Sequence, residues 1–246
     1  MDTLSSPYLW RPSKNEPPEL SRSEMLRYLG HSHQAIGDDL AGRIEAAAAL
    51  ATEDARPVGV YRVFRSAAAC NDDEEPCIRL LGTTIELQGR DIYRHLKDAS
   101  RCAVLCCTLG MQTERRMREL AARDPLDATL YDAACSALVE GAVDMLDESV
   151  QQRASSHGFK TNWRFSCGYG DCPLEAQPSL LAALNAGRLC GVSATPGCLL
   201  LPSKSVTAMI GLFEGEVRDA DSRPNCSICR LRTSCAFRAH QTTCYR

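Results

Sequence analysis

Long apolar segments and an excess of basic charge are both missing from this sequence of 246 residues. No apolar run approaches the roughly 18 residues that cross a bilayer, so we expect no membrane-spanning segment. The first residues, Met1–Pro7, lack the basic flank and apolar stretch of a secretory signal, which favours a cytoplasmic protein. The formal net charge of -3 argues against a general nucleic-acid binder, whose surface would be basic.

Lysine is scarce as well, because only four of the 28 cationic residues are Lys and the rest are Arg. We attribute this bias to the base composition of the genome rather than to phosphate recognition. The remaining composition is ordinary for a folded domain, with 44% hydrophobic and 24% charged residues, which excludes collagen-like, coiled-coil and wholly disordered chains. The length allows one large domain, or one domain plus a small appendage.

Cysteine, in contrast, is abundant, with 14 residues that fall into two populations. Ten are scattered, and those in the apolar run 101–108 are expected to pack as small hydrophobes. The other four follow a polar break near the C-terminal end and are Cys226, Cys229, Cys235 and Cys244. Four thiolates can hold one zinc ion or a [4Fe-4S] cluster, although this spacing matches no standard finger or ferredoxin. A redox thiol pair and the absence of any role are the alternatives.

The chain divides into three predicted parts. Residues 1–20 contain four prolines and predict an extended arm, in which the apolar segment 8–10 would anchor to something else. Residues 21–215 contain the regular elements. Residues 216–246 form the Cys-rich tail.

Apolar periodicity and turn residues predict both helices and strands in the middle part. Ser21, with Glu24 three residues later, has the pattern of a helix N-cap. Helices are expected over residues 22–29, 39–53, 90–97, 110–122, 125–153 and 174–184. Strands are expected over residues 58–64, 78–87, 102–108, 199–201 and 205–212. Because there is no regular βαβ rhythm and no internal repeat, we predict an α+β fold: a single mixed domain with a twisted, mainly antiparallel sheet flanked by helices, plus the Cys-rich tail.

The longest predicted helix, residues 125–153, has two notable stripes. Its apolar stripe begins at Leu126 and Leu130 and continues at helical spacing. Small residues at Ala133, Ala137 and Gly141 recur every four positions and would let another backbone approach closely.

The segment 163–174 carries the most informative motif. Two glycines flank Tyr169 and leave the backbone free to adopt positive φ beside a ligand. Arg164, four residues before Gly168, offers a planar fork suited to a carboxylate, and the Tyr ring offers a π face for a cation. Together these groups would suit a small zwitterion with a positive centre. The alternative interpretation is a Gly-rich turn with a structural Arg.

The motif Arg164-x3-Gly168-Tyr169 resembles that of the reactivation domain of cobalamin-dependent methionine synthase. More closely, the chain is similar to the free-standing form of that domain, the activation subunit found beside truncated synthases in some anaerobic bacteria. The resemblance spans roughly residues 21–215 and includes several separated blocks in the same order, which are Arg22–Gly30, Leu87–Leu96, Thr108–Gly110, Asp132–Cys135 and Leu201–Ala208. The tail with Cys235 also resembles the end of the stand-alone subunits.

The resemblance implies a binding site for S-adenosylmethionine, with Arg164 on its carboxylate and Gly168 and Tyr169 lining the site. Cys167 departs from the family, which commonly has Pro before Gly-Tyr. The family's large enzymes also use an N-terminal Asp for the ligand's amino group, and Glu24 is the counterpart we suggest here.

Three further polar residues are open to two interpretations each. The family's acidic groups on the long helix lie toward cobalamin, so Asp132 and Glu140 either do the same or form a solvent-facing stripe. Lys204 is either a solvated loop residue or a residue of the ligand or partner surface.

The resemblance also implies the function. The chain would be a methyltransferase accessory subunit that binds S-adenosylmethionine and supports reductive methylation of inactive cob(II)alamin on a partner cobalamin-dependent methionine synthase, with an electron donor such as flavodoxin or ferredoxin. The sequence has no Asp-x-His-x-x-Gly pattern for a cobalt ligand and no Gly-x-Gly-x-x-Gly after a strand, so the partner would hold the cobalamin. The alternative is a zinc- or Fe–S-binding redox adaptor that caps a corrinoid protein without methyl transfer.

Overall fold

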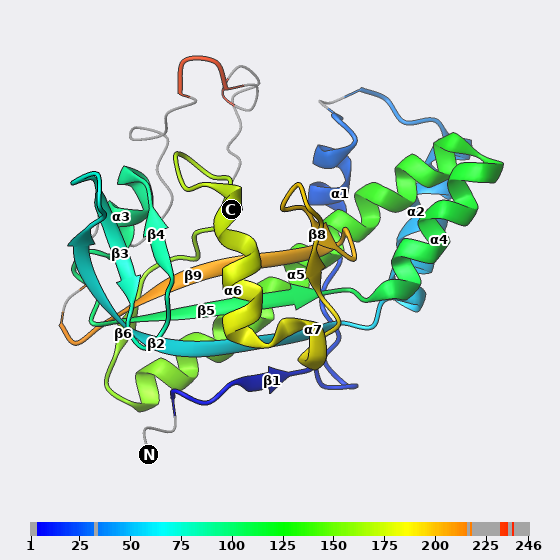
Figure 1. Cartoon of the computed structure of the whole chain (residues 1–246). Coiled ribbons are helices and arrows are strands. Elements are labelled where there is room, and N and C mark those ends of the chain that lie inside the picture. Colours follow the sequence, from blue (N-terminus) through cyan, green and yellow to red (C-terminus); the bar gives the residue numbers. More distant parts are fainter. Residues whose placement is uncertain (1–3, 32–33, 216, 218–231, 236–237, 239–246) are drawn as a thin grey trace.

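The structure is a computed structural model that describes residues 4–31, 34–215, 217, 232–235 and 238 (Figure 1). Its centre is a sheet of seven strands in the order β4-β3-β2-β5-β9-β6, with β1 also paired to β2. All of these pairings are antiparallel. The α+β prediction of an antiparallel sheet flanked by helices is therefore confirmed. Within the described residues, no helix combines the length and the apolar character needed to cross a membrane.

The strands of this sheet come from the whole length of the described chain. They are β1 (Tyr8–Trp10), β2 (Val58–Cys70), β3 (Pro76–Leu80), β4 (Glu86–Gln88), β5 (Arg101–Thr108), β6 (Lys160–Thr161) and β9 (Ser205–Phe213). A small hairpin of β7 (Ser193–Ala194) and β8 (Leu200–Leu201) stands beside them. The first half of β2 pairs with β5 and its second half with β3, so one long strand joins the two ends of the sheet.

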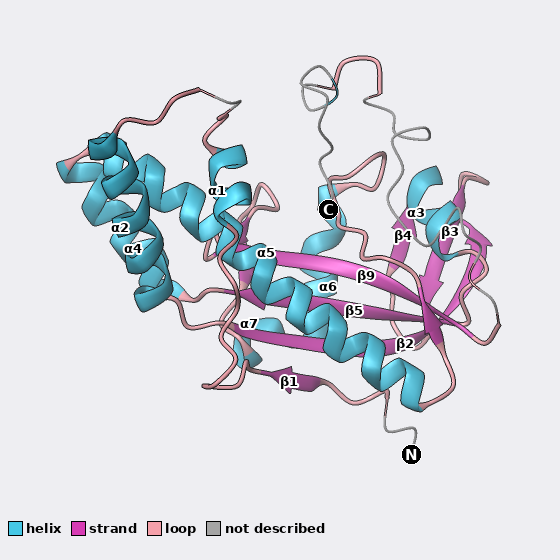
Figure 2. Cartoon of the chain, turned by 180° about the vertical axis from the view of Figure 1, so that it is seen from behind, coloured by secondary structure: helices cyan, strands magenta, loops and turns pink. Residues whose placement is uncertain are grey.

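Helices cover both faces of the sheet (Figures 1 and 2). In the helical layer, α5 (Pro125–Ser156) crosses one face of the sheet, and α1 (Arg22–Tyr28), α2 (Asp38–Asp54) and α4 (Met111–Arg123) pack against it, with α2 and α4 beyond one end of the strands. The loop layer lies on the other face and consists of α3 (Arg90–Leu96), residues 162–173, the 3-10 turn Leu174–Ala176, α6 (Gln177–Leu184) and α7 (Ala186–Leu189).

Strand β5 shows how the sheet separates two cores. Side chains alternate between the two faces of a strand, so neighbouring residues enter different layers. Ala103, Leu105 and Cys107 pack in the core below the helical layer. Cys102, Val104 and Cys106 pack in the core below the loop layer. The cysteines of this run are therefore packed as apolar side chains, as predicted.

Helix α5 is the central helix of the helical layer. Asp124 begins it as an N-cap, because its carboxylate accepts hydrogen bonds from the amides of Leu126 (2.9 Å) and Asp127 (3.3 Å). The stripe of small residues lets another backbone segment approach closely, as predicted. A Cβ at Gly141 would overlap the carbonyl oxygen of Glu19. Leu126 is an exception to the predicted apolar stripe, because it lies in the first turn and is 42% exposed.

The N-terminal arm packs on the chain's own sheet, which differs from the anchor to another molecule that its sequence suggested. Tyr8–Trp10 pairs with Val60 and its neighbours on β2, and Leu4 and Trp10 are buried. A second difference is the predicted strand 78–87, which is two strands, β3 and β4. A turn at residues 81–84 separates them, and Gly82 there has φ +84.

Candidate functional site

Arg164 lies on a short extended segment at the edge of β9. Phe165 forms an isolated bridge with Met209, with backbone N–O distances of 2.9 and 2.8 Å. Phe165 is buried in the core of the loop layer. Because side chains alternate along an extended segment, Arg164 points the opposite way, toward α5 of the helical layer.

Three carboxylates of α5 surround the Arg164 guanidinium. Its nitrogens lie 2.6 Å from Asp144, 2.9 Å from Glu140 and 3.6 Å from Asp147. The side chain remains 26% exposed, so it lies at a partly open surface rather than in packed core. The pKa of Arg164 is raised, because burial, which lowers it, is outweighed by the attraction of Asp144 and Glu140. The guanidinium therefore stays charged within a site of net negative charge.

Sequence reasoning named Glu140 but missed Asp144 and Asp147. Positions i, i+4 and i+7 of a helix share one face, so Glu140, Asp144 and Asp147 were predictable as one patch of negative charge. Such a patch favours a neighbouring cation. The pKa of Asp147 is raised by burial, with smaller opposing contributions from Gln151 and Arg164.

The Gly-Tyr segment forms a tight turn immediately after Arg164. Gly168 and Gly170 have φ +86 and +58, as the sequence predicted. The amide of Gly168 donates to the carbonyl of Cys172 (2.8 Å). A Cβ at Gly170 would overlap the Asp91 carboxylate, which would have to move, and the φ of +58 at this position also favours glycine. Tyr169, at the tip, is 66% exposed and presents its ring to the surroundings.

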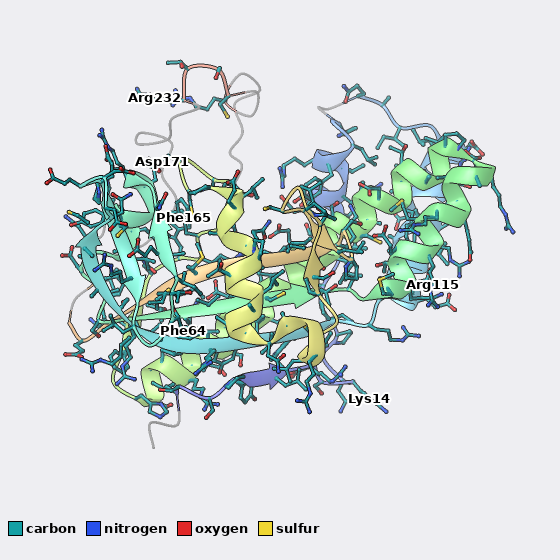
Figure 3. All side chains as sticks on the ribbon, in the orientation of Figure 1. Lys14, Phe64, Arg115, Phe165, Asp171 and Arg232 are labelled. Carbon is teal, nitrogen blue, oxygen red and sulfur yellow. The ribbon has the colours of Figure 1, made fainter. Side chains whose placement is uncertain are left out.

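Asp171 ties this turn to the start of α3. Its carboxylate oxygens accept hydrogen bonds from the backbone amides of Arg90 (2.8 Å) and Asp91 (2.9 Å). These amides have no partner within their own helix, so the turn supplies the N-cap that the adjacent residue, Gly89, cannot provide. Figure 3 shows Asp171 beside α3, at the end of the molecule opposite Arg115 on α4.

Buried hydrogen bonds of Asn162 hold the start of the segment 162–173 in place. Asn162 donates to the carbonyl of His95 (2.8 Å) and accepts from the amide of Gly211 (2.7 Å), which joins α3 to β9. The His95 ring packs edge-on against Trp163, with centroids 4.7 Å apart. Burial lowers the pKa of His95 to about 4, so this histidine is neutral near pH 7.

The other predicted polar residues lie in different places. Lys204 is not a solvated loop residue: its ammonium lies 2.8 Å from Asp132 and donates to Ser136 on α5, and its side chain is 13% exposed. Asp132 therefore binds a cation farther along the same helix rather than joining Arg164. Glu24 receives a hydrogen bond from Arg27 (3.0 Å) of its own helix.

The predicted metal ligands Cys226, Cys229 and Cys244 lie outside the described residues. Cys235 is described and is a free, half-buried thiol. Among the residues that the structure places, no group of three or more His, Cys, Asp or Glu side chains is arranged to hold a metal ion.

Two hollows on the described surface lie away from the motif. The larger, of about 570 Å³, is between α1 and α2 and includes Met25 and Ile44. The smaller, of about 330 Å³, lies between β4 and α6 and includes Ile85 and Ser179. Neither is lined by Arg164 or Tyr169.

Comparison with known proteins defines the class of fold. No family model matches the chain, and no curated protein matches it. A solved structure, the MetH reactivation domain bound to AdoHcy, is similar, with a TM-score of 0.59 and 12% sequence identity. The match covers 92% of this chain and 84% of that one. The chain therefore has a fold like that of the methionine synthase reactivation domain, as the sequence motifs predicted.

Proposed function

We propose that the chain binds S-adenosylmethionine through Arg164, Gly168 and Tyr169. We further propose that it is an activation subunit for a partner cobalamin-dependent methionine synthase, on which it supports reductive methylation of cob(II)alamin. The observation that carries the proposal is the likeness, over 92% of the chain, to a domain solved with S-adenosylhomocysteine, the demethylated form of this ligand.

The Arg164 site has the groups that such a ligand needs. The guanidinium offers two parallel donors to the ligand carboxylate. Asp144 and Glu140 now occupy those donors, but their side chains are 35% and 31% exposed, so they can turn outward when a ligand carboxylate arrives. The exposed ring of Tyr169, at the tip of the turn, can cover a cationic group of the ligand.

The charge of the site favours the same class of ligand. One guanidinium among Glu140, Asp144 and Asp147 leaves an excess of negative charge when all three carboxylates are ionised. S-adenosylmethionine has one carboxylate and two cationic centres, its ammonium and its sulfonium. Its carboxylate would pair with Arg164 while its cations offset the remaining acidic groups.

The role of this chain in the reaction is to bind and position the donor. The partner's reduced corrinoid supplies the nucleophile, and a flavodoxin or ferredoxin supplies the electron. No nucleophile is needed from this chain, because holding the methyl donor in one orientation is itself a large contribution to rate. The exposed face around Tyr169 would meet the partner.

Calorimetric titration of S-adenosylmethionine into the pure chain tests the site. We expect Arg164→Ala to weaken binding by about 2–3 kcal/mol, or roughly 30- to 150-fold in Kd, because a charge-assisted pair is lost. Arg164→Lys keeps the charge but not the planar fork, so its loss should be intermediate. The matched control is Arg115→Ala, an exposed arginine in the first half of α4 at the opposite end of the molecule from Asp171, which should bind as the native chain does. Equal affinities for all four proteins would contradict the site.

A second experiment tests the reaction. The chain, S-adenosylmethionine and reduced flavodoxin are added to a synthase subunit that holds cob(II)alamin but lacks a domain of this kind. We expect the visible spectrum to change to that of methylcobalamin, and to do so far more slowly with Arg164→Ala. A rate that does not depend on this chain would contradict the proposed function, even if the chain binds the ligand.

A further inference from the structure

Two cysteines bracket the turn that carries Tyr169. Cys172 donates a hydrogen bond to the sulfur of Cys167, and the two sulfurs are 4.0 Å apart. Both are free thiols, 7% and 2% exposed respectively. A disulfide bond is about 2.05 Å long, so the two sulfurs need to approach by roughly 2 Å to form one.

The backbone between them already brings the two residues together. The amide of Gly168 donates to the Cys172 carbonyl (2.8 Å), and the amide of Cys172 donates to the Tyr169 carbonyl (3.1 Å). The turn between the cysteines includes Gly168 and Gly170, which can change φ more easily than other residues. A cross-link here can therefore form by a local change of the turn.

The two thiols differ in reactivity. The hydrogen bond from Cys172 lowers the pKa of Cys167, although burial opposes the effect. The same contact, together with burial, raises the pKa of Cys172. Cys167 is also the more exposed of the two. Cys167 is thus the thiolate that attacks an incoming disulfide, and Cys172 is the thiol that resolves the product.

We propose that Cys167 and Cys172 are a reversible redox modification site, whose oxidant is a small-molecule or protein disulfide, and that their oxidation weakens ligand binding by the turn. The second part rests on the proposed function. In the first step, the Cys167 thiolate attacks the disulfide, forms a mixed disulfide and releases one thiol. In the second step, Cys172 loses its proton and attacks the Cys167 sulfur, which releases the second thiol. Two electrons pass to the oxidant, and two protons leave the cysteines.

Oxidation acts on the ligand site through the shape of the turn. Drawing the sulfurs together changes the path of Gly168–Asp171, and with it the place of Tyr169. It also disturbs the two hydrogen bonds that Asp171 accepts from the start of α3. Arg164 lies only three residues before Cys167, so the position of Tyr169 relative to Arg164 changes, and the two no longer fit the same ligand.

Peptide mapping after treatment with oxidised glutathione tests the modification. We expect a cross-linked peptide containing Cys167 and Cys172, a mass lower by two hydrogens, and full reversal by dithiothreitol. Exposed Cys70 is the internal control for the reagent, because it should become a mixed disulfide with glutathione, whereas fully buried Cys102 should not react. Modification of Cys70 without any Cys167–Cys172 cross-link would overturn the proposal.

Calorimetry on the same samples tests the effect on binding. We expect about tenfold weaker binding of S-adenosylmethionine to the oxidised chain, and no effect of the oxidant on Cys167→Ser, which lacks the attacking thiol. In Cys172→Ser the mixed disulfide should accumulate on Cys167, as a mass increase of one glutathione, because the resolving thiol is missing. A mapped cross-link with unchanged affinity would overturn the second part of the proposal. A reduced chain that does not bind S-adenosylmethionine would instead contradict the proposed function, while the peptide map would still decide the redox site.

Discussion

The two faces of the sheet are covered in different ways. The helical layer is built from long helices whose apolar and small residues repeat at helical spacing, and α5 alone spans 32 residues. The loop layer is built from short helices and the segment 162–173, whose shape depends on polar contacts between residues far apart in the chain. Examples are Asp171 with the start of α3 and Asn162 with His95 and Gly211. The helices of the first layer thus carry strong local sequence signals, whereas the shape of the segment 162–173 depends on contacts that are distant in the sequence.

The candidate site lies where the two layers meet. Arg164 belongs to the loop layer, but its partners Glu140, Asp144 and Asp147 belong to α5. The helix fixes the backbone positions from which the three carboxylates project, and the glycine-containing turn can change shape around a ligand. This division suits a site that binds, positions and releases a small molecule.

The largest expected effect is the loss of stability caused by a cavity in the helical layer. Leu138 on α5 is 1% exposed, so Leu138→Ala should lower the free energy of unfolding by about 2–5 kcal/mol. Leu126 lies on the same helix but is 42% exposed, and Leu126→Ala should change stability by no more than about 0.5 kcal/mol. Urea unfolding of both variants measures the difference. Equal losses would show that burial does not distinguish the two positions.

The next effect concerns acid stability of the loop layer. His95 has its pKa lowered from 6.5 to about 4 by burial, so the unfolded chain takes up a proton before the folded chain does. Its contribution to stability is therefore complete above about pH 6.5 and is lost as the pH falls toward 4. Between pH 7 and pH 5 the loss should be about 2 kcal/mol.

His95→Gln isolates this contribution, because glutamine does not titrate. The difference in unfolding free energy between the native chain and the variant should shrink by that amount over the same pH range, whatever the cost of the substitution at pH 7. Parallel pH profiles for the two proteins would show that the pKa of His95 does not differ between the folded and the unfolded chain.

The smallest expected effect is the loss of the cap that joins the turn to α3. Asp171→Ala removes two hydrogen bonds to the start of that helix and should cost about 0.5–2 kcal/mol. Asp72→Ala, in an exposed loop, is the control and should be neutral within about 0.5 kcal/mol. Thermal unfolding measures both. If the two variants melt alike, Asp171 does not hold the turn.

Much of the fold could be predicted, with errors of a consistent kind. The predicted helix over 125–153 agrees with α5 because apolar residues at helical spacing and the Asp124 cap are local signals. The predicted strand over 78–87 was wrong because Gly82, with φ +84, begins a turn between two apolar segments that were read as one strand. The ion pair of Lys204, which contradicts its interpretation as a solvated loop residue, could not be predicted because its partner Asp132 is 72 positions away in the sequence.

The sequence by itself determined which elements form, which faces of them are apolar, and that Gly168 and Gly170 adopt positive φ on either side of Tyr169. These properties depend on residues close in the chain, whose periodicity and backbone preferences act locally. Only the tertiary structure decided that Arg164 faces three carboxylates, that Asp171 caps α3, and that the thiols of Cys167 and Cys172 meet. Each of these depends on the path of the folded backbone and on packing between elements, which bring together groups that sequence spacing does not relate.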